Sequence, residues 1–232
     1  MLEFPEPQRK VAEAAATALL SHFDLEDLSM GGGTVLQTRW EHRKSLDVDL
    51  FCKSDVFARV HRESGGEVEK VMIECAGADP DRTWMEYMAL YGEIEGIEVT
   101  LMPHVFILDE AFDGVLPGSV PVRLQATSEI LAKKLRHRLH GASTVEVRDV
   151  YDLACAVELA PEALNDARQA LSPEQCYEVC ALLAQLPKGW SGQTNKPLIK
   201  PLLDWDEAEL VEVVRSALMN PCPLDPATRP RP

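Results

Sequence analysis

The stretch Gly31-Gly-Gly-Thr-Val-Leu-Gln-Thr-Arg-Trp-Glu-His-Arg-Lys-Ser-Leu-Asp-Val-Asp-Leu-Phe51 decides the fold of this chain. Its last part predicts a strand over residues 45–52, in which apolar residues alternate with Asp47 and Asp49. Side chains two positions apart on a strand project from the same face, so these carboxylates should lie side by side. Like charges that close are costly unless a cation lies between them. Mg²⁺ usually takes one or two carboxylates together with water and substrate phosphates, so the pair predicts a magnesium site.

The glycines that open the stretch predict a phosphate-binding turn. Glycine lets backbone N–H groups approach a phosphate without interference from a Cβ atom. A helix expected over residues 34–43 would add the partial positive charge of its N-terminus. Gly32, Gly33 and Thr34 are therefore expected to hold a triphosphate through N–H groups and a hydroxyl. Arg43, in the basic group that follows, is expected to neutralise phosphate charge.

Hydrophobic periodicity and turn signals divide the chain into a mixed part and a helical part. Residues 1–125 are expected to hold helices over 7–23, 34–43, 55–62 and 80–91 and strands over 45–52, 68–75, 98–104 and 120–125. Residues 126–220 are expected to be helical, and the proline-rich residues 221–232 to be disordered. The expected class is α+β, a mixed β-sheet flanked by helices and followed by a helical C-terminal part.

Three motifs in order give residues 30–155, about two thirds of the chain, a resemblance to a known family. The first combines the glycine turn, His42-Arg-Lys-Ser45 and the Asp47-Val-Asp-Leu-Phe51 element. The others are Glu129-Ile-Leu-Ala-Lys-Lys-Leu135 and Arg148-Asp-Val-Tyr-Asp-Leu-Ala154. Together they resemble the AbiEii-type toxins of bacterial type IV toxin–antitoxin systems, in the nucleotidyltransferase superfamily. The resemblance implies the nucleotidyltransferase fold and the transfer of NMP from an NTP to an acceptor hydroxyl, with release of pyrophosphate.

The resemblance also implies a set of metal ligands. Asp47 and Asp49 would be the first two ligands of Mg²⁺, and Mg²⁺ and the NTP would bind together. The superfamily commonly adds a third carboxylate from a neighbouring strand. Glu74, near the end of the strand expected over residues 68–75, is the candidate for that position.

A lysine is implied in the helical part. Lys134 matches the family's lysine and would contact the triphosphate, with Lys133 as its competitor, because the two point about 100° apart on a helix. Asp149 or Asp152 would orient this lysine or receive the acceptor's proton. We expect Lys134 and Asp149 to meet, facing the Asp47–Asp49 strand across a cleft.

Charge and hydropathy exclude some classes of function. The formal net charge of −15 argues against broad, nonspecific nucleic-acid binding, although basic residues gather at 39–44 and 133–140. No apolar run approaches the ~20 residues that span a membrane, and the first residues resemble no signal peptide, so a cytoplasmic protein with no membrane partner is expected. The six cysteines form no C-x-x-C pair, which indicates neither a zinc site nor a disulfide scaffold.

Three functions stay open at this point. The first is a toxin that modifies a hydroxyl of tRNA or of a protein and is held by a cognate antitoxin. The second is a transferase acting on a small, aminoglycoside-like molecule, which an acidic surface would suit better than tRNA. The third is a nucleotide-binding module that keeps the fold without turnover. The presence of Asp47, Asp49, Lys134 and Asp149 favours an enzyme.

Overall fold

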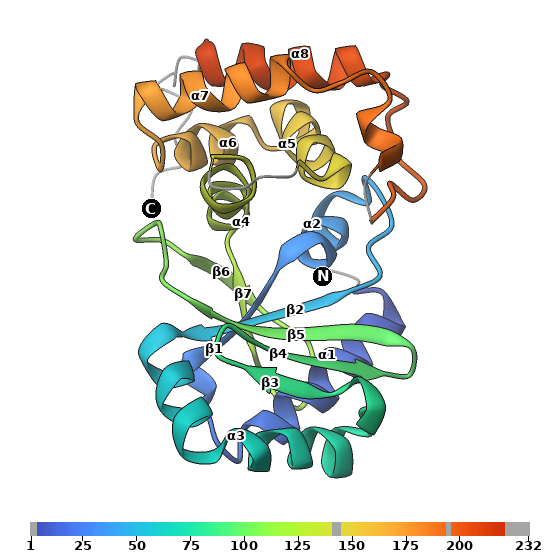
Figure 1. The fold of residues 1–232 in the computed structure, drawn as a ribbon, viewed down its shortest axis with the longest axis vertical. Coiled ribbons are helices and arrows are strands. Elements are labelled where there is room, and N and C mark those ends of the chain that lie inside the picture. The colour runs from blue at the N-terminus through green and yellow to red at the C-terminus, as the bar shows by residue number, and fades with distance from the viewer. Residues whose placement is uncertain (1–3, 141–144, 194–195, 221–232) are drawn as a thin grey trace. The chain divides into compact units, whose positions relative to one another are not determined.

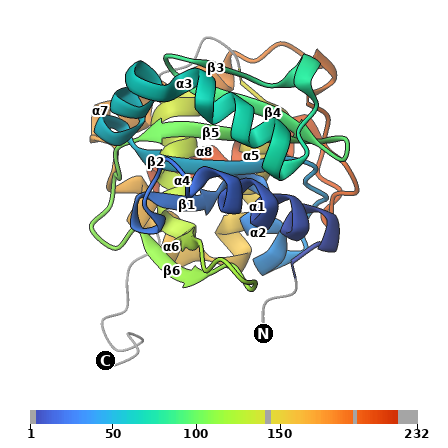
Figure 2. The ribbon, with the colours of Figure 1, turned by 90° about the horizontal axis from the view of Figure 1, so that it is seen from below.

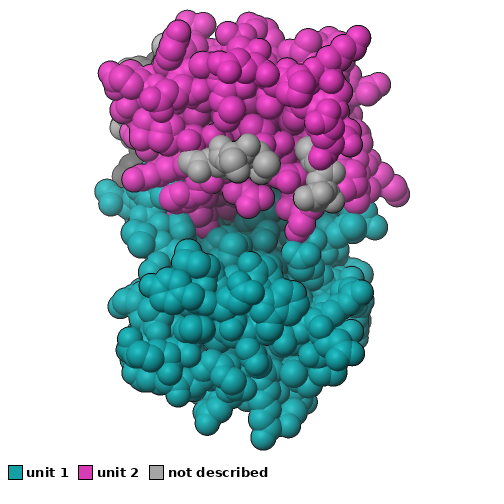
Figure 3. Space-filling model, in the orientation of Figure 1, with its two compact units in different colours: residues 1–126 teal, residues 127–232 magenta. Residues whose placement is uncertain are grey.

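The chain divides into two compact units in a computed structural model that describes residues 4–140, 145–193 and 196–220. Unit 1 is Met1–Ala126 and unit 2 is Thr127–Pro232, drawn in separate colours in Figure 3. The segment 221–232, expected to be disordered, lies outside the described residues.

Unit 1 is built on one seven-stranded mixed sheet with the strand order β3-β4-β5-β2-β1-β7-β6. The pairs β1–β7 and β2–β5 are parallel, and the other neighbouring pairs are antiparallel. The strands are β1 (Leu28–Gly31), β2 (Val48–Lys53), β3 (Trp84–Glu86), β4 (Ala89–Ile94), β5 (Ile97–His104), β6 (Phe112–Val115) and β7 (Arg123–Gln125).

The two faces of this sheet differ in chemistry. Leu50 of β2 is aligned with Leu101 of β5 and Met30 of β1, and all three are buried. Helices α1 (Glu6–Leu19) and α3 (Ser54–Ala76) cover this apolar face, as Figures 1 and 2 show. Helix α2 (Gly32–Trp40) lies on the opposite face (Figure 1), which carries the polar residues of β2.

The predicted mixed sheet flanked by helices is confirmed, but two predicted elements are wrong. The helix expected over 55–62 is present as the first part of α3, but the strand expected over 68–75 is wrong, because Val68 and Met72 are buried at helical spacing and α3 continues through these residues. The expected turn survives only as a kink at Ser64 (φ −151°, ψ 25°).

The helix expected over residues 80–91 is also absent. Pro80–Arg82 forms a short 3₁₀ turn, and the hairpin β3–β4 follows. Trp84 and Tyr91 pair across this hairpin, with ring centroids 5.0 Å apart, and aromatic cross-strand pairs of this kind stabilise strands. The local aromatic content therefore outweighed the helix-start signal at Asp79-Pro80.

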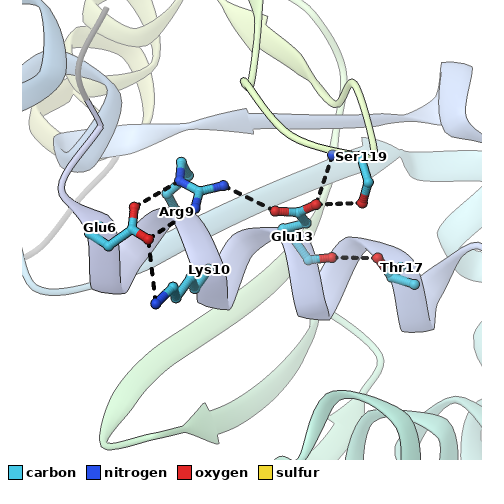
Figure 4. A network of polar contacts seen from close by, with 6 residues as sticks. All are labelled: Glu6, Arg9, Lys10, Glu13, Thr17 and Ser119. Atoms are coloured by element: carbon cyan, nitrogen blue, oxygen red, sulfur yellow. Dashed lines mark hydrogen bonds and ion pairs between the residues drawn. The ribbon is translucent and has the colours of Figure 1, made fainter.

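A polar network fastens the segment before β7 to α1 (Figure 4). The Glu13 carboxylate accepts hydrogen bonds from the backbone N–H and the hydroxyl of Ser119, and it also pairs with Arg9. Arg9 bridges onward to Glu6, one turn earlier on the helix. These bonds lower the pKa of Glu13 below its ordinary value. The network fixes the path by which the chain enters β7 beside β1.

Unit 2 is helical, as predicted. Its helices are α4 (Thr127–Lys133), α5 (Val147–Leu159), α6 (Pro161–Arg168), α7 (Pro173–Ala184) and α8 (Glu207–Met219). Ser172 and Asp206 cap α7 and α8 through reciprocal bonds with Gln175 and Glu209. The helix expected to run on beyond α4 does so as a π-helix, Lys134–His140.

None of the helices within the described residues combines the length and the apolar character needed to cross a bilayer.

Candidate active site

The carboxylate of Asp49, on β2, lies on the sheet face that also carries α2, and Asp47 stands one residue before this strand. Val48, Leu50 and Cys52 are buried against the core, whereas Asp47 and Asp49 alternate with them and are half-buried. The hydroxyl of Thr100, on β5, donates to Asp49 Oδ1 at 3.3 Å. The predicted acidic strand is therefore confirmed, and Asp49 is fixed from its neighbouring strand.

The glycine turn lies directly against Asp49. Gly31 is the N-cap of α2 and is aligned with Asp49 across β1 and β2. Gly32 has a positive φ of +72°, and a Cβ atom placed there would lie 1.9 Å from Asp49 Oδ2. Only glycine fits both the backbone conformation and this approach. The start of α2 therefore lies in direct contact with the Asp49 carboxylate.

The first turn of α2 is arranged to receive an anion. The N-cap of this helix is Gly31, which has no side chain to cap the first N–H groups. A Cβ on Gly33 would lie 2.5 Å from Arg43 Nη2, so glycine also admits the Arg43 guanidinium to this end of the helix. The guanidinium adds its charge to the partial positive charge of the helix terminus.

Thr34 and Arg43 are both built into the fold. The Thr34 hydroxyl donates to the backbone oxygen of Asp47 at 2.5 Å, and its side chain is fully buried. Arg43 is 4% exposed, and its Nη1 donates to the oxygen of Lys44 at 3.4 Å. Thr34 therefore holds the start of the acidic strand to α2, so that the predicted phosphate turn and carboxylates form one piece of structure.

The structural reason for choosing Glu74 is wrong. Glu74 lies on α3, on no strand of the sheet, and its exposed side chain pairs with Lys70 at 3.9 Å. The strand beside β2 is β5, where Val48 is aligned with Val99.

The chemistry of these residues fits a magnesium ion that is shared with a substrate. Among the described residues, no group of three or more His, Cys, Asp and Glu side chains could hold a metal by itself. Mg²⁺ is reluctant to enter such all-protein cages and commonly takes one or two carboxylates plus phosphates and water. Asp47 and Asp49 supply the carboxylates, and the start of α2 supplies a phosphate-binding position beside them.

A second polar cluster is buried inside unit 2. The Lys134 ammonium pairs with Asp149 Oδ1 and lies 3.0 Å from Asp152 Oδ2. Lys134 is 8% exposed, and both aspartates are more deeply buried. The predicted meeting of Lys134 and Asp149 is confirmed. That Lys134 faces the Asp47–Asp49 strand stays a prediction. Lys133 is 9% exposed, so burial does not distinguish it from Lys134 as the lysine that would contact the triphosphate.

Arg138 is a member of this cluster that the sequence did not reveal. Its Nε lies 3.2 Å from Asp149 Oδ2, so Asp149 receives a cation on each oxygen. Lys134 and Arg138 both belong to the π-helix, whose wider turn no local sequence signal predicted. Burial raises the pKa of Asp149, but the charges of Lys134 and Arg138 outweigh it, and the pKa lies below its ordinary value.

One comparison with known proteins agrees with this architecture. No protein-family profile matches the chain, and no curated protein matches its sequence. A crystal structure of a candidate nucleotidyltransferase from H. pylori superposes with a TM-score of 0.50 at 13% identity, covering 94% of each chain. The solution structure of the antibiotic-resistance factor ANT(2'')-Ia matches with a TM-score of 0.40 at 19% identity, covering 77% of this chain and 90% of that one. The first likeness confirms the predicted nucleotidyltransferase fold.

Proposed function

We propose that the protein is a nucleotidyltransferase that moves NMP from an NTP to an acceptor hydroxyl in a Mg²⁺-dependent reaction. The contact between Gly32 and Asp49 carries this proposal. It joins a phosphate-binding helix terminus to a metal-binding carboxylate at a distance that excludes even a methyl group. A site for either phosphate or metal alone would not require that approach.

Each group has a definite task in this reaction. The N–H groups at the start of α2 and the Arg43 guanidinium bind the triphosphate oxygens and hold the α-phosphate in place. Asp47 and Asp49 would hold Mg²⁺, whose other ligands would be water and the NTP phosphates. When bound, the metal neutralises charge on the leaving pyrophosphate and favours the ionised acceptor hydroxyl. Thr100 keeps the Asp49 carboxylate oriented through its hydrogen bond.

The unit 2 cluster is proposed to supply a further cation for the phosphates. A lysine ammonium has three N–H donors. Asp149 and Asp152 each form an ion pair with the Lys134 ammonium and can accept from two of these donors. The two aspartates hold Lys134 in place, and a phosphate oxygen would accept from its third donor. The motif order that resembles AbiEii-type toxins makes a tRNA or protein hydroxyl the first acceptor to test, and a cognate antitoxin the first partner.

The test is transfer of label from each of the four α-labelled NTPs, with Mg²⁺, to total RNA, total protein and a mixture of small hydroxyl compounds. The wild-type chain should label one acceptor fraction, and Asp49→Asn should abolish the labelling. Asp55→Asn, which alters an exposed carboxylate of the same unit, is the matched control and should leave it unchanged. Full activity of Asp49→Asn would refute the proposal.

A further inference from the structure

Three polar side chains lie against the three glycines at the start of α2, one against each glycine. A Cβ atom on the second glycine would meet the Asp49 carboxylate, and one on the third would meet the Arg43 guanidinium. On Gly31, the N-cap, it would lie 2.3 Å from Oε1 of Gln125 and 2.8 Å from its Cδ. Asp49 and Arg43 already have tasks in the proposed reaction. Gln125, on β7, has none, although its amide lies as close to the turn as they do.

The Gln125 amide is only half satisfied. The side chain is fully buried, and its Nε2 donates to the hydroxyl of Ser29, on β1, at 3.2 Å. Its Oε1 is also buried and has no hydrogen-bond partner within residues 4–140, 145–193 and 196–220. A buried carbonyl oxygen without a donor is costly, and folded proteins contain few of them. The unsatisfied end of this amide is the end that faces the N-cap of α2.

Ser29 allows the amide to take either of two orientations. A hydroxyl can donate or accept, so the Ser29 hydroxyl can donate to Oε1 as readily as it accepts from Nε2. The last torsion of a glutamine side chain has two broad, roughly equivalent minima, so a half-turn exchanges the two atoms with little change in shape. After the half-turn, Oε1 is bonded to Ser29 and Nε2 faces the N-cap. The amide then offers a donor at the place where the proposed function puts phosphate.

The charge at the turn selects between these orientations. Without an anion, the first N–H groups of α2 and the Arg43 guanidinium create a positive potential, which favours the amide oxygen facing them. A phosphate bound at the turn reverses the local charge and favours Nε2, which can donate to a phosphate oxygen. The N-cap Cα is about 3.8 Å from the Cα of the first helical residue, so a side chain against the N-cap can reach a phosphate held there.

We propose that Gln125 binds the phosphates of the NTP: its amide turns when the anion arrives, Nε2 donates to a phosphate oxygen, and Ser29 donates to Oε1. This inference rests on the proposed function, which puts the NTP phosphates at the start of α2. Gly31 is required, because a Cβ atom there would occupy the space in which the amide turns. The bond to phosphate exists only in the complex, whereas a bond to Ser29 exists in both states. Gln125 should therefore govern the affinity for phosphate, and Ser29 should not.

The test is calorimetric titration of the full chain with inorganic triphosphate and Mg²⁺, a probe that has neither ribose nor base. Gln125→Met keeps the length of the side chain and removes the amide. It should weaken binding by roughly tenfold to a hundredfold, the size of one lost hydrogen bond to a charged group. Gln125→Glu can accept from Ser29 but cannot donate to phosphate, so it should weaken binding at least as much. Ser29→Ala is the matched control and should leave the affinity for triphosphate unchanged.

Stability and affinity together separate phosphate binding from a purely structural role of Gln125. Ser29→Ala and Gln125→Met both break the side-chain bond between β1 and β7, so both should lower the free energy of unfolding in urea. Only Gln125→Met should lower the affinity for triphosphate. Equal effects of the two variants on affinity, or unchanged binding by Gln125→Met, would overturn the inference. Full triphosphate affinity in Gln125→Glu would also overturn it, because the carboxylate offers no donor.

The two proposals fail in different experiments. Transfer of label that survives Asp49→Asn refutes the proposed function, and that assay does not involve Gln125. Triphosphate binding is measured without an acceptor and compares variants of Gln125 and Ser29 alone. A wild-type chain that transfers NMP and binds triphosphate, but does not need the Gln125 amide for either, overturns only the role proposed for Gln125.

Discussion

Replacing Gly32 with alanine tests the junction on which the proposed function depends. The new Cβ would lie 1.9 Å from Asp49 Oδ2. Restoring a separation of about 3.5 Å moves that oxygen by roughly 1.5 Å, if the start of α2 stays in place. Misplacing a reacting group by about 1 Å can cost about 10²-fold in rate. Gly32→Ala should therefore lower the rate of NMP transfer by about 10²-fold or more.

Backbone strain must be separated from this displacement. Gly32 has φ +72°, and a left-handed conformation costs a non-glycine residue about 1–2 kcal/mol. Gly77, at the C-cap of α3, has the same φ of +72°, and a Cβ there would meet nothing within 4 Å. Gly77→Ala should lose similar stability in urea unfolding and keep wild-type activity.

The assay compares both variants in labelled NMP transfer and in calorimetric binding of a non-hydrolysable NTP with Mg²⁺. Folding is checked for each by urea unfolding, so that a loss of activity can be separated from a loss of structure. If Gly32→Ala and Gly77→Ala lose stability equally and are equally active, the close approach of Gly32 to Asp49 has no catalytic meaning. That result would refute the reasoning.

Three further predictions concern the buried groups. Lys134→Met should destabilise the chain by about 3–5 kcal/mol in urea, because it removes the Lys134 cation from two buried carboxylates. Adding Asp149→Asn and Asp152→Asn should restore part of the loss, and an unchanged unfolding midpoint of Lys134→Met would contradict the buried cluster. The pKa of Asp149 is lowered in the fold, so the stability that this carboxylate contributes is complete above its ordinary pKa of 3.8 and disappears as the pH falls through the folded pKa. Asp149→Asn should therefore flatten the acid limb of the curve of unfolding free energy against pH, and an unaltered acid limb would argue against the shift. Burial, with the charges of Asp27 and Asp55, raises the pKa of Cys52 to about 12. Iodoacetamide should therefore label the exposed Cys75 in the native chain and Cys52 only after unfolding. Early labelling of Cys52, detected by peptide mass spectrometry, would be inconsistent with its burial.

The parts of the site that could be predicted are those with short-range signals. Alternation along residues 45–52 predicted β2 and its acidic face, and the three glycines predicted the start of α2. The pairing of Lys134 with Asp149 followed from motif order and from the length of the connection between two helices. Each of these conclusions needed only the local spacing of apolar and polar residues, or the length of one connection between two consecutive helices.

The errors came where tertiary packing overrode a local signal. Ser64-Gly-Gly66 suggested a turn, and Ser64 does interrupt the helix. The error was to expect a strand beyond it, because burial of Val68 and Met72 at a spacing of four keeps residues 68–75 helical. That error placed Glu74 on a strand that the structure does not contain. The parallel alignment of β2 with β5 joins residues about 50 positions apart, and no local pattern encodes such a register.

The distribution of charge bears on how an acidic chain could accept the anionic substrate that the proposed function requires. A net charge of −15 describes the long-range field, but in the proposed reaction an NTP would meet the start of α2 and Arg43, where partial and full positive charges coincide. Asp47 and Asp49 become favourable for the same substrate only when a cation accompanies it.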